Sequence, residues 1–326
     1  MKSLDLLRMN TVRKHKITSR CIAFSGDNAN INFGGLAGRE GKNVFSALKK
    51  DLNENRVGVG CPAYILQTVC NMEMMLFLLI LSLWFHIYAV RTQELKEFCE
   101  FVDVNYLQLL NHSKTRWLTL YPAVERIVQL FPALKSYFPS QGRKSVPSSV
   151  TNFLENDFSE LYLLLLSSTM HIFHCKILSL EREHNSVVEV LELLESVQSS
   201  LKGRLEGQFI PLKVRQMLNT FSEDGLDKEC KVFMENVSCF YETCTEYLDK
   251  WMHPIEEFKC FKWLKLQNIK ALSFDDIVPC IHYLQSKGVE IDDSKLFDQF
   301  CNIRAYSKTS TLDKDTTLDQ QWFVFI

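Results

Sequence analysis

Residues 21–35, CIAFSGDNANINFGG, decide how the amino-terminal part of the chain folds. The apolar run from Cys21 to Phe24 predicts a short buried strand, and the glycines and asparagines after it predict a turn. Asp27 follows the strand and is therefore expected at the edge of a sheet. A carboxylate in that position is typical of magnesium sites for phosphoryl transfer, although an SGDN turn alone is more often a structural Asx turn.

The residues that follow complete a small α/β unit. Val44, Leu48 and Leu52 recur at helical spacing and predict a helix over 43–55, and VGVGCPAY at 57–64 predicts a second short strand. Further along, apolar residues recur at three- and four-residue spacings, so the rest of the chain is predicted to be helical. The fold class is therefore mainly α with a small α/β part. The main predicted helices span residues 93–113, 122–138, 157–183, 186–206 and 226–252.

Two helix ends carry specific local patterns. Ser186 with Glu189 three residues later predicts a capping box at the start of the helix over 186–206. In FDDIVPCIHYLQSKGVEIDD, residues 274–293, Gly288 is predicted to end a helix because glycine readily adopts a positive φ.

Composition limits the classes of partner and compartment. Lys and Arg total 37 against 39 Asp and Glu, and a net charge of -2 supplies no field that would draw the whole chain onto nucleic acid or anionic lipid. Any DNA contact must be local. The 11 cysteines include no CxxC pair, which argues against a zinc ribbon and a disulfide framework. The first residues contain no apolar leader, so we expect an intracellular protein, in the nucleus or the cytoplasm. The densest basic stretch comprises Arg8, Arg13, Lys14, Lys16 and Arg20.

Two weaker motifs have ordinary explanations. The stretch FGGLAGREGKN is glycine-rich, but Leu36 and Asn43 stand where a Walker loop needs Gly and Ser or Thr, so a flexible turn is favoured. His171, His174 and Cys175 share one face of a predicted helix, where they would suit a metal ion. On so apolar a helix, core packing or one satisfied hydrogen bond per histidine is the stronger interpretation.

Three blocks taken together resemble the hAT superfamily of DNA transposases and the host proteins derived from them. They are CIAFSGDNANINFGG at 21–35, VGVGCPAYILQTV at 57–69 and HSKTRWLTLYPAVERIVQLFPALKSYF at 112–138. Weaker similarity covers most of the chain from residue 21 to residue 300. It runs through YAVRTQELKEFCEFVD, SVVEVLELL, FYETCTEYLDKWM and SKGVEIDDSKLFDQF.

The resemblance implies a ribonuclease-H-like fold interrupted by a large all-helical insertion, with an Asp-Asp-Glu triad that binds magnesium or manganese. Asp27 matches the second aspartate of that triad. Cys61 matches the first residue of a Cys-x-x-His element, whose histidine position holds Tyr64 here, and a tyrosine cannot replace the imidazole. Arg116 and Trp117 match a family element that handles unpaired bases at the excised DNA end, a task that suits stacking on an indole.

The resemblance also implies truncation at both ends. About two dozen residues precede Asp27, too few for the opening strands that carry the first catalytic aspartate. No block matches the third acid, the family's dimerisation segment or its zinc finger. Because the two-metal site needs convergent carboxylates, we expect an inactive, domesticated remnant of a transposable element that acts in nucleic-acid or protein interaction. The alternative is a fragment of an active metal-dependent DNA transposase that a homologous transposase chain completes.

An apolar run, MMLFLLILSLWFHIYAV at residues 74–90, reaches the lower length limit for crossing a bilayer. A single-pass membrane protein is therefore a further alternative. The family has an acidic amphipathic segment at this place, and one choice of codons for residues 71–82, read in a frame offset by two nucleotides, gives such a segment. We interpret the run as the product of a local frameshift, and we expect neither a membrane partner nor a small-molecule substrate.

These observations divide the chain into five expected segments. They are a basic lead-in over 1–20, a ribonuclease-H-like α/β fragment over 21–70, an apolar helix over 71–90, a helical insertion-type domain over 91–305 and a carboxy-terminal tail over 306–326.

Overall fold

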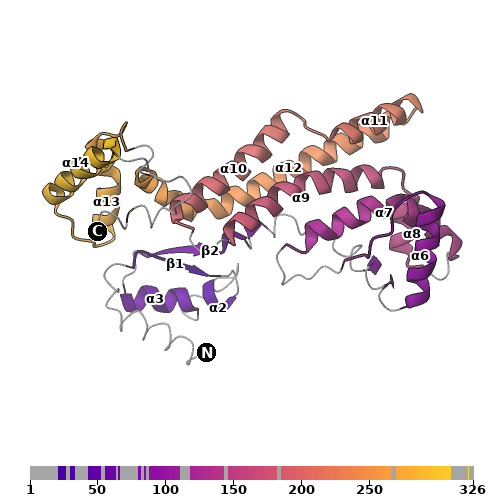
Figure 1. Cartoon of the computed structure of the whole chain (residues 1–326), viewed down its shortest axis with the longest axis horizontal. Coiled ribbons are helices and arrows are strands. Elements are labelled where there is room, and N and C mark those ends of the chain that lie inside the picture. The colour runs from indigo at the N-terminus through magenta and orange to yellow at the C-terminus, as the bar shows by residue number, and fades with distance from the viewer. Residues whose placement is uncertain are drawn as a thin grey trace. The chain divides into compact units, whose positions relative to one another are not determined.

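The chain is mainly helical, with one two-stranded parallel sheet in the part that the structure describes (Figure 1). The predicted fold class is confirmed at this level. The computed structural model describes residues 21–26, 30–33, 43–52, 56–63, 65–66, 80–81, 84–85, 88–110, 118–142, 146–181, 185–265, 269–309 and 322.

Contacts divide the chain into two compact units, which do not follow the order of the sequence. The first unit comprises Met1–Ile65, Arg182–Glu195 and Asp249–Ile326, and the second comprises Leu66–Glu181 and Ser196–Leu248. The long helices α10 (Val187–Glu206) and α12 (Asp227–Glu256) contribute residues to both units.

The first unit contains the α/β part. β1 (Ala23–Gly26) and β2 (Val57–Gly60) pair in parallel and in register along their whole length. The connection between them includes α2 (Asn30–Phe33) and α3 (Val44–Leu52), so the predicted strand–helix–strand order is confirmed.

Helix α3 begins with a side-chain cap and packs through its apolar face. The Ser46 amide donates a 2.8 Å hydrogen bond to Asn43 Oδ1, which satisfies one of the free N–H groups at the helix start. Val44 and Leu48 are buried. The Phe45 ring contacts two further phenylalanine rings, one from β1 and one from α2, at centroid distances of 6.2 and 5.6 Å. This aromatic cluster fixes α3 against the sheet.

The carboxy-terminal part of the first unit is a small helical cluster. It comprises η1 (Glu257–Leu264), η3 (Phe274–Asp276), α13 (Val278–Ser286) and α14 (Asp293–Thr309). The predicted end of α13 is confirmed, because Gly288 has a φ of +82°. The side chains at the centre of this cluster are Ile269, Ile277, Ile281, Phe300 and Ile303.

The second unit is a bundle of amphipathic helices. Its most extensive helix contacts join α6 (Ala89–Phe101) to α7 (Leu120–Ser140) and α7 to α9 (Ser159–Leu180). The shorter α8 (Ser148–Glu155) contacts α7, and α11 (Leu212–Glu223) contacts α9. The buried side chains of α7 include Val124, Ile127, Leu130, Phe131, Leu134 and Tyr137.

Helix α6 is shorter than the sequence pattern predicts. The helix expected over 93–113 ends at Phe101 because Asp103 adopts a positive φ of 55°, and the Val104 amide turns back to donate to the Cys99 carbonyl at 2.9 Å. Residues 104–110 follow without helix or strand structure. The prediction of a helix was therefore wrong over this stretch.

The capping box predicted at the start of α10 is confirmed. The Glu189 amide donates to Ser186 Oγ at 3.2 Å, and the Ser186 amide donates to Glu189 Oε2 at 2.8 Å. The two hydrogen bonds satisfy the backbone amides of Glu189, in the first turn of the helix, and of Ser186, the residue that caps it.

Much of the apolar run at 74–90 lies outside the described residues; Leu81, Trp84 and Phe85 in its described part pack as protein core, whereas residues 88–90 are exposed. Leu81 is fully buried, and the Trp84 and Phe85 rings lie 5.8 and 5.3 Å from Phe138 and Tyr137 of α7. In the described part of the chain, one helix, α9, is long and apolar enough to cross a membrane by length and composition alone.

Candidate functional sites

The residues that the family resemblance singles out lie mostly outside the described part of the chain. Asp27, Tyr64, Arg116 and Trp117 are among them, so their predicted roles remain predictions. Cys61 is described: it follows β2 directly, is half-buried, and its carbonyl accepts a 3.0 Å hydrogen bond from the Ile65 amide.

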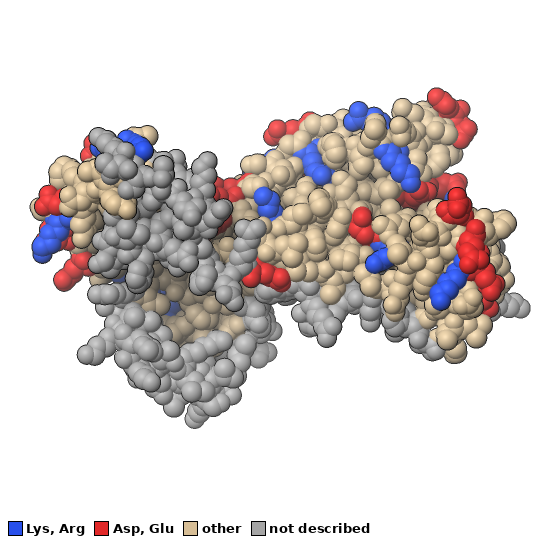
Figure 2. Space-filling view, viewed as in Figure 1, with Lys and Arg blue, Asp and Glu red and all other residues tan. Residues whose placement is uncertain are grey.

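A groove of about 360 Å³ opens in the first unit and carries an excess of positive charge. We call it the cationic groove. Among the described residues, three fixed cations line it, Lys49, Arg56 and Lys287, together with one carboxylate, Glu257. The remaining lining residues are Phe45, Val57, Gly58, His253 and Pro254. On the face drawn in Figure 2, Lys and Arg are interspersed with Asp and Glu over the described helices rather than gathered into one field, so a local excess of this kind stands out.

Each cation of the groove is positioned by a different element. Lys49 lies in the last turn of α3, with its Nζ 4.9 Å from the centre of the Phe45 ring. Arg56 immediately precedes β2 and is 7% exposed. Lys287 follows α13, has a side chain only 14% exposed, and lies 3.2 Å from Glu257 Oε2. The groove therefore combines charges from sequence-distant segments around the start of β2.

Glu257 also binds a neighbouring phenol. The Tyr283 hydroxyl donates to Glu257 Oε2 at 3.4 Å. Burial, and then the negative charge of Glu257, raise the pKa of Tyr283 above its usual range, so the phenol stays protonated and acts as a donor. One carboxylate is thus shared between Lys287 and Tyr283, which weakens its ability to neutralise the rest of the groove.

The cationic groove lies at the amino end of the strand pair, whereas the sequence predicts Asp27 at the carboxyl end of β1. Val57 and Gly58 line the groove and begin β2, whereas Asp27 comes after Gly26, the last residue of β1. Because the strands run parallel and in register, their amino ends lie together at one edge of the sheet. The groove is therefore separate from the edge at which a catalytic carboxylate was expected.

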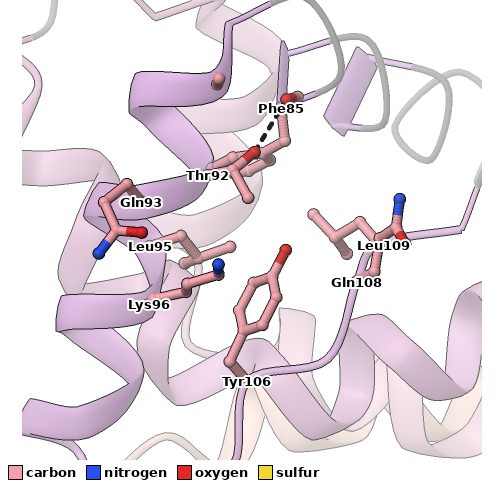
Figure 3. A pocket seen from close by; sticks show the side chains of 9 residues that line it. Phe85, Thr92, Gln93, Leu95, Lys96, Tyr106, Gln108 and Leu109 are labelled. Atoms are coloured by element: carbon pink, nitrogen blue, oxygen red, sulfur yellow. Dashed lines mark hydrogen bonds between the residues drawn. The ribbon is translucent and has the colours of Figure 1, made fainter.

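A second pocket, of about 590 Å³, lies in the second unit between α6 and the irregular residues 104–110 (Figure 3). Its buried apolar lining includes Phe85, Leu95 and Leu109. The Lys96 ammonium lies 5.2 Å from the centre of the Tyr106 ring, and both side chains face the hollow in Figure 3. Burial and then the Cys99 thiol raise the pKa of Tyr106. The pocket thus combines apolar side chains with the polar Thr92, Gln93 and Gln108, and it holds its Tyr106 hydroxyl in the neutral form.

The three metal-ligand candidates of α9 differ in their burial. His174 is half-buried, and its ring lies 4.9 Å from that of Tyr121 on α7. His171 and Cys175 are exposed. Core packing is thus confirmed for His174, whereas His171 is exposed and has a hydrogen-bond contact with Cys175 Sγ, 3.6 Å from its Nε2. His174 Nδ1 is buried without a partner in the described part of the chain.

Burial, and next the neighbouring His171, lower the pKa of His174 below its ordinary value. A small void of about 20 Å³ lies beside the ring, lined mainly by apolar side chains. Within the described ranges, no group of three or more His, Cys, Asp or Glu is arranged to hold a metal ion.

Comparison of the chain with protein-family models, with curated proteins and with solved structures finds no match in any of the three.

Proposed function

We propose that the chain is a domesticated, hAT-transposase-derived module that binds nucleic acid through phosphate contacts at the cationic groove. The observation that carries the proposal is the meeting of Lys49, Arg56 and Lys287 in one groove of the described part of the chain. With a net charge of -2 the chain has no general attraction for a polyanion, so binding depends on a local cluster of this kind.

The side chains of the groove differ in what they offer to a phosphate. Arg56 is only 7% exposed, so its charge acts on a phosphate at a distance, whereas the two lysines act as point charges on flexible stems. The groove volume of about 360 Å³ accommodates a backbone segment, not a whole duplex. Binding of this type positions a nucleic acid without reading its sequence.

The family resemblance gives the proposal its second support. The parallel strand pair with its helical crossover agrees with a piece of a ribonuclease-H-like core, in which Asp27 follows the first strand. The proposed role is interaction inside the nucleus, and it assigns no catalytic step to Asp27.

The test compares two neighbouring lysines of α3. Lys49 lines the cationic groove, and Lys50, the next residue, is exposed and does not line it. We expect the wild-type chain to bind a labelled duplex of mixed sequence with an affinity that falls as salt rises, by about 0.9 in the logarithmic slope for each phosphate contacted. Lys49→Ala should weaken binding and reduce that slope by about one, while Lys50→Ala should leave both close to wild type.

Equal effects of the two substitutions would show that the cationic groove is not the binding site. Absence of salt-dependent binding by the wild-type chain would show that the chain does not bind nucleic acid and would reject the proposed function. A separate assay addresses catalysis. Magnesium-dependent strand cleavage that disappears in Asp27→Ala would replace the interaction role with that of an active transposase fragment.

A further inference from the structure

His171 and Cys175 form an outward-facing pair one turn apart on α9. Both side chains are exposed, and His171 Nε2 lies 3.6 Å from Cys175 Sγ. The alternative ring nitrogen, Nδ1, lies 4.0 Å from the same sulfur. His174 turns toward Tyr121 instead and takes no part in the pair.

The nitrogen–sulfur separation of this pair matches that of two ligands on one zinc ion. Zinc bonds to histidine nitrogen at about 2.0–2.1 Å and to cysteine sulfur at about 2.3 Å. At a tetrahedral angle of about 109° these bond lengths place the two ligand atoms about 3.6 Å apart. A thiol–imidazole hydrogen bond also spans this separation, so the geometry must be tested with a metal.

We propose that His171 Nε2 and Cys175 Sγ form a two-ligand chelating site for a borderline-soft divalent cation of the zinc type, with water in the remaining coordination positions. The neutral imidazole donates a lone pair, and the thiol releases its proton to solvent as the metal–sulfur bond forms. Because only two protein ligands converge, the site is exchangeable and open, unlike a closed structural zinc site.

The surroundings reduce the cost of bringing the two ligands together. Residues four apart on a helix already face the same side, and the Tyr121 ring lies 5.4 Å from that of His171, which restricts the imidazole. Both ligands are on the solvent side, so a hydrated cation reaches them without opening the helix bundle. The proposal is independent of the cationic groove, which lies in the other unit.

The test titrates the reduced full-length chain with Co²⁺, which reports thiolate coordination through a sulfur-to-metal charge-transfer band, and then displaces it with Zn²⁺. Cys175→Ser should abolish the part of the band that saturates first, and His171→Ala should weaken Co²⁺ binding by at least about tenfold. Cys301→Ser is the control, because it removes an exposed thiol on α14 that has no histidine three or four residues away. It should leave that part of the band unchanged.

Circular dichroism of each variant checks that α9 and the other helices are retained. A first-saturating band that survives Cys175→Ser overturns the proposal. So does a band that needs Cys175 but is unaffected by His171→Ala, since the thiol then binds alone and the pair is an S–H···N hydrogen bond only.

Discussion

The Arg204 Nη1 atom lies 3.3 Å from the Tyr241 hydroxyl oxygen, so a side chain of α10 donates a hydrogen bond to one of α12 inside the second unit. The same guanidinium donates to Ser168 Oγ and to the Ser168 carbonyl oxygen of α9, both at 3.3 Å. Its centre lies 4.7 Å from the Phe209 ring. One half-buried cation thus joins three helices through neutral acceptors.

Replacing this cation should destabilise the second unit. Arg204→Met keeps much of the apolar stem but removes every donor, and we expect the free energy of unfolding to fall by about 2 kcal/mol, the range for hydrogen bonds to a charged group. Urea unfolding followed by circular dichroism measures the change. Arg215→Met, at an exposed position of α11, is the control and should stay within about 0.5 kcal/mol of wild type. Equal stabilities for the two variants would show that the network contributes nothing.

Features that depend on neighbouring residues were predictable from the sequence. The capping box of Ser186 and Glu189 and the glycine stop at Gly288 are set within one helical turn, and the structure contains both. Helix α6 shows the limit of such reasoning. Apolar spacing continues past Phe101, but the backbone reverses at Asp103, whose left-handed conformation no periodicity encodes.

The cationic groove was not predictable because no local pattern contains it. Lys49 and Arg56 are close together in the sequence. Lys287, by contrast, follows α13 more than two hundred residues further along. The expectation that His171, His174 and Cys175 share one face of α9 was wrong for a different reason. At about 100° per residue, His171 and Cys175 nearly coincide on the helix surface while His174 is rotated from Cys175 by a full residue step. The position of Tyr121 then decides which ring turns inward.

The cap of α10 offers a measurement of local stability. Ser186→Ala removes the acceptor for the Glu189 amide and half of the reciprocal box, so we expect a loss of about 1 kcal/mol in the free energy of unfolding. Ser199→Ala, at an exposed position inside the same helix, removes a hydroxyl without uncapping the helix and should be neutral or slightly stabilising. Thermal denaturation compares them. A Ser199→Ala loss as large as that of Ser186→Ala would contradict the capping role.

Gly58 is required by the close approach of an aromatic ring to β2. A Cβ atom at this position would lie 2.7 Å from the Phe45 ring, well inside contact distance. Gly58→Ala should therefore destabilise the α/β part by about 1–3 kcal/mol, and Phe45→Leu in the same chain should recover part of that loss. Gly203→Ala is the counterpart, because a Cβ there, in the last turn of α10, meets nothing within 4 Å. It should stabilise the chain by about 0.5–1 kcal/mol. Chemical denaturation of the single and double variants measures both effects, and a tolerated Gly58→Ala would show that the ring yields.

His174 should make stability depend on pH in the mildly acidic range. Burial and then His171 lower the pKa of His174 from its ordinary 6.5, while Glu181 acts in the opposite direction. The unfolded chain therefore takes up this proton at a higher pH than the folded chain does. As a result, the free energy of unfolding falls as the pH drops below about 6.5 and levels off only below the folded-state pKa.

His174→Phe keeps a ring against Tyr121 and removes the titration, so it should flatten that part of the pH profile. Tyr121 and His171 lie next to the His174 ring, so each pH point is compared between variant and wild type rather than read alone. Urea unfolding at closely spaced pH values gives the profile. His282→Ala, at an exposed position of α13, should leave the slope unchanged. If the wild-type and His174→Phe profiles are parallel across this range, protonation of the buried ring does not oppose folding.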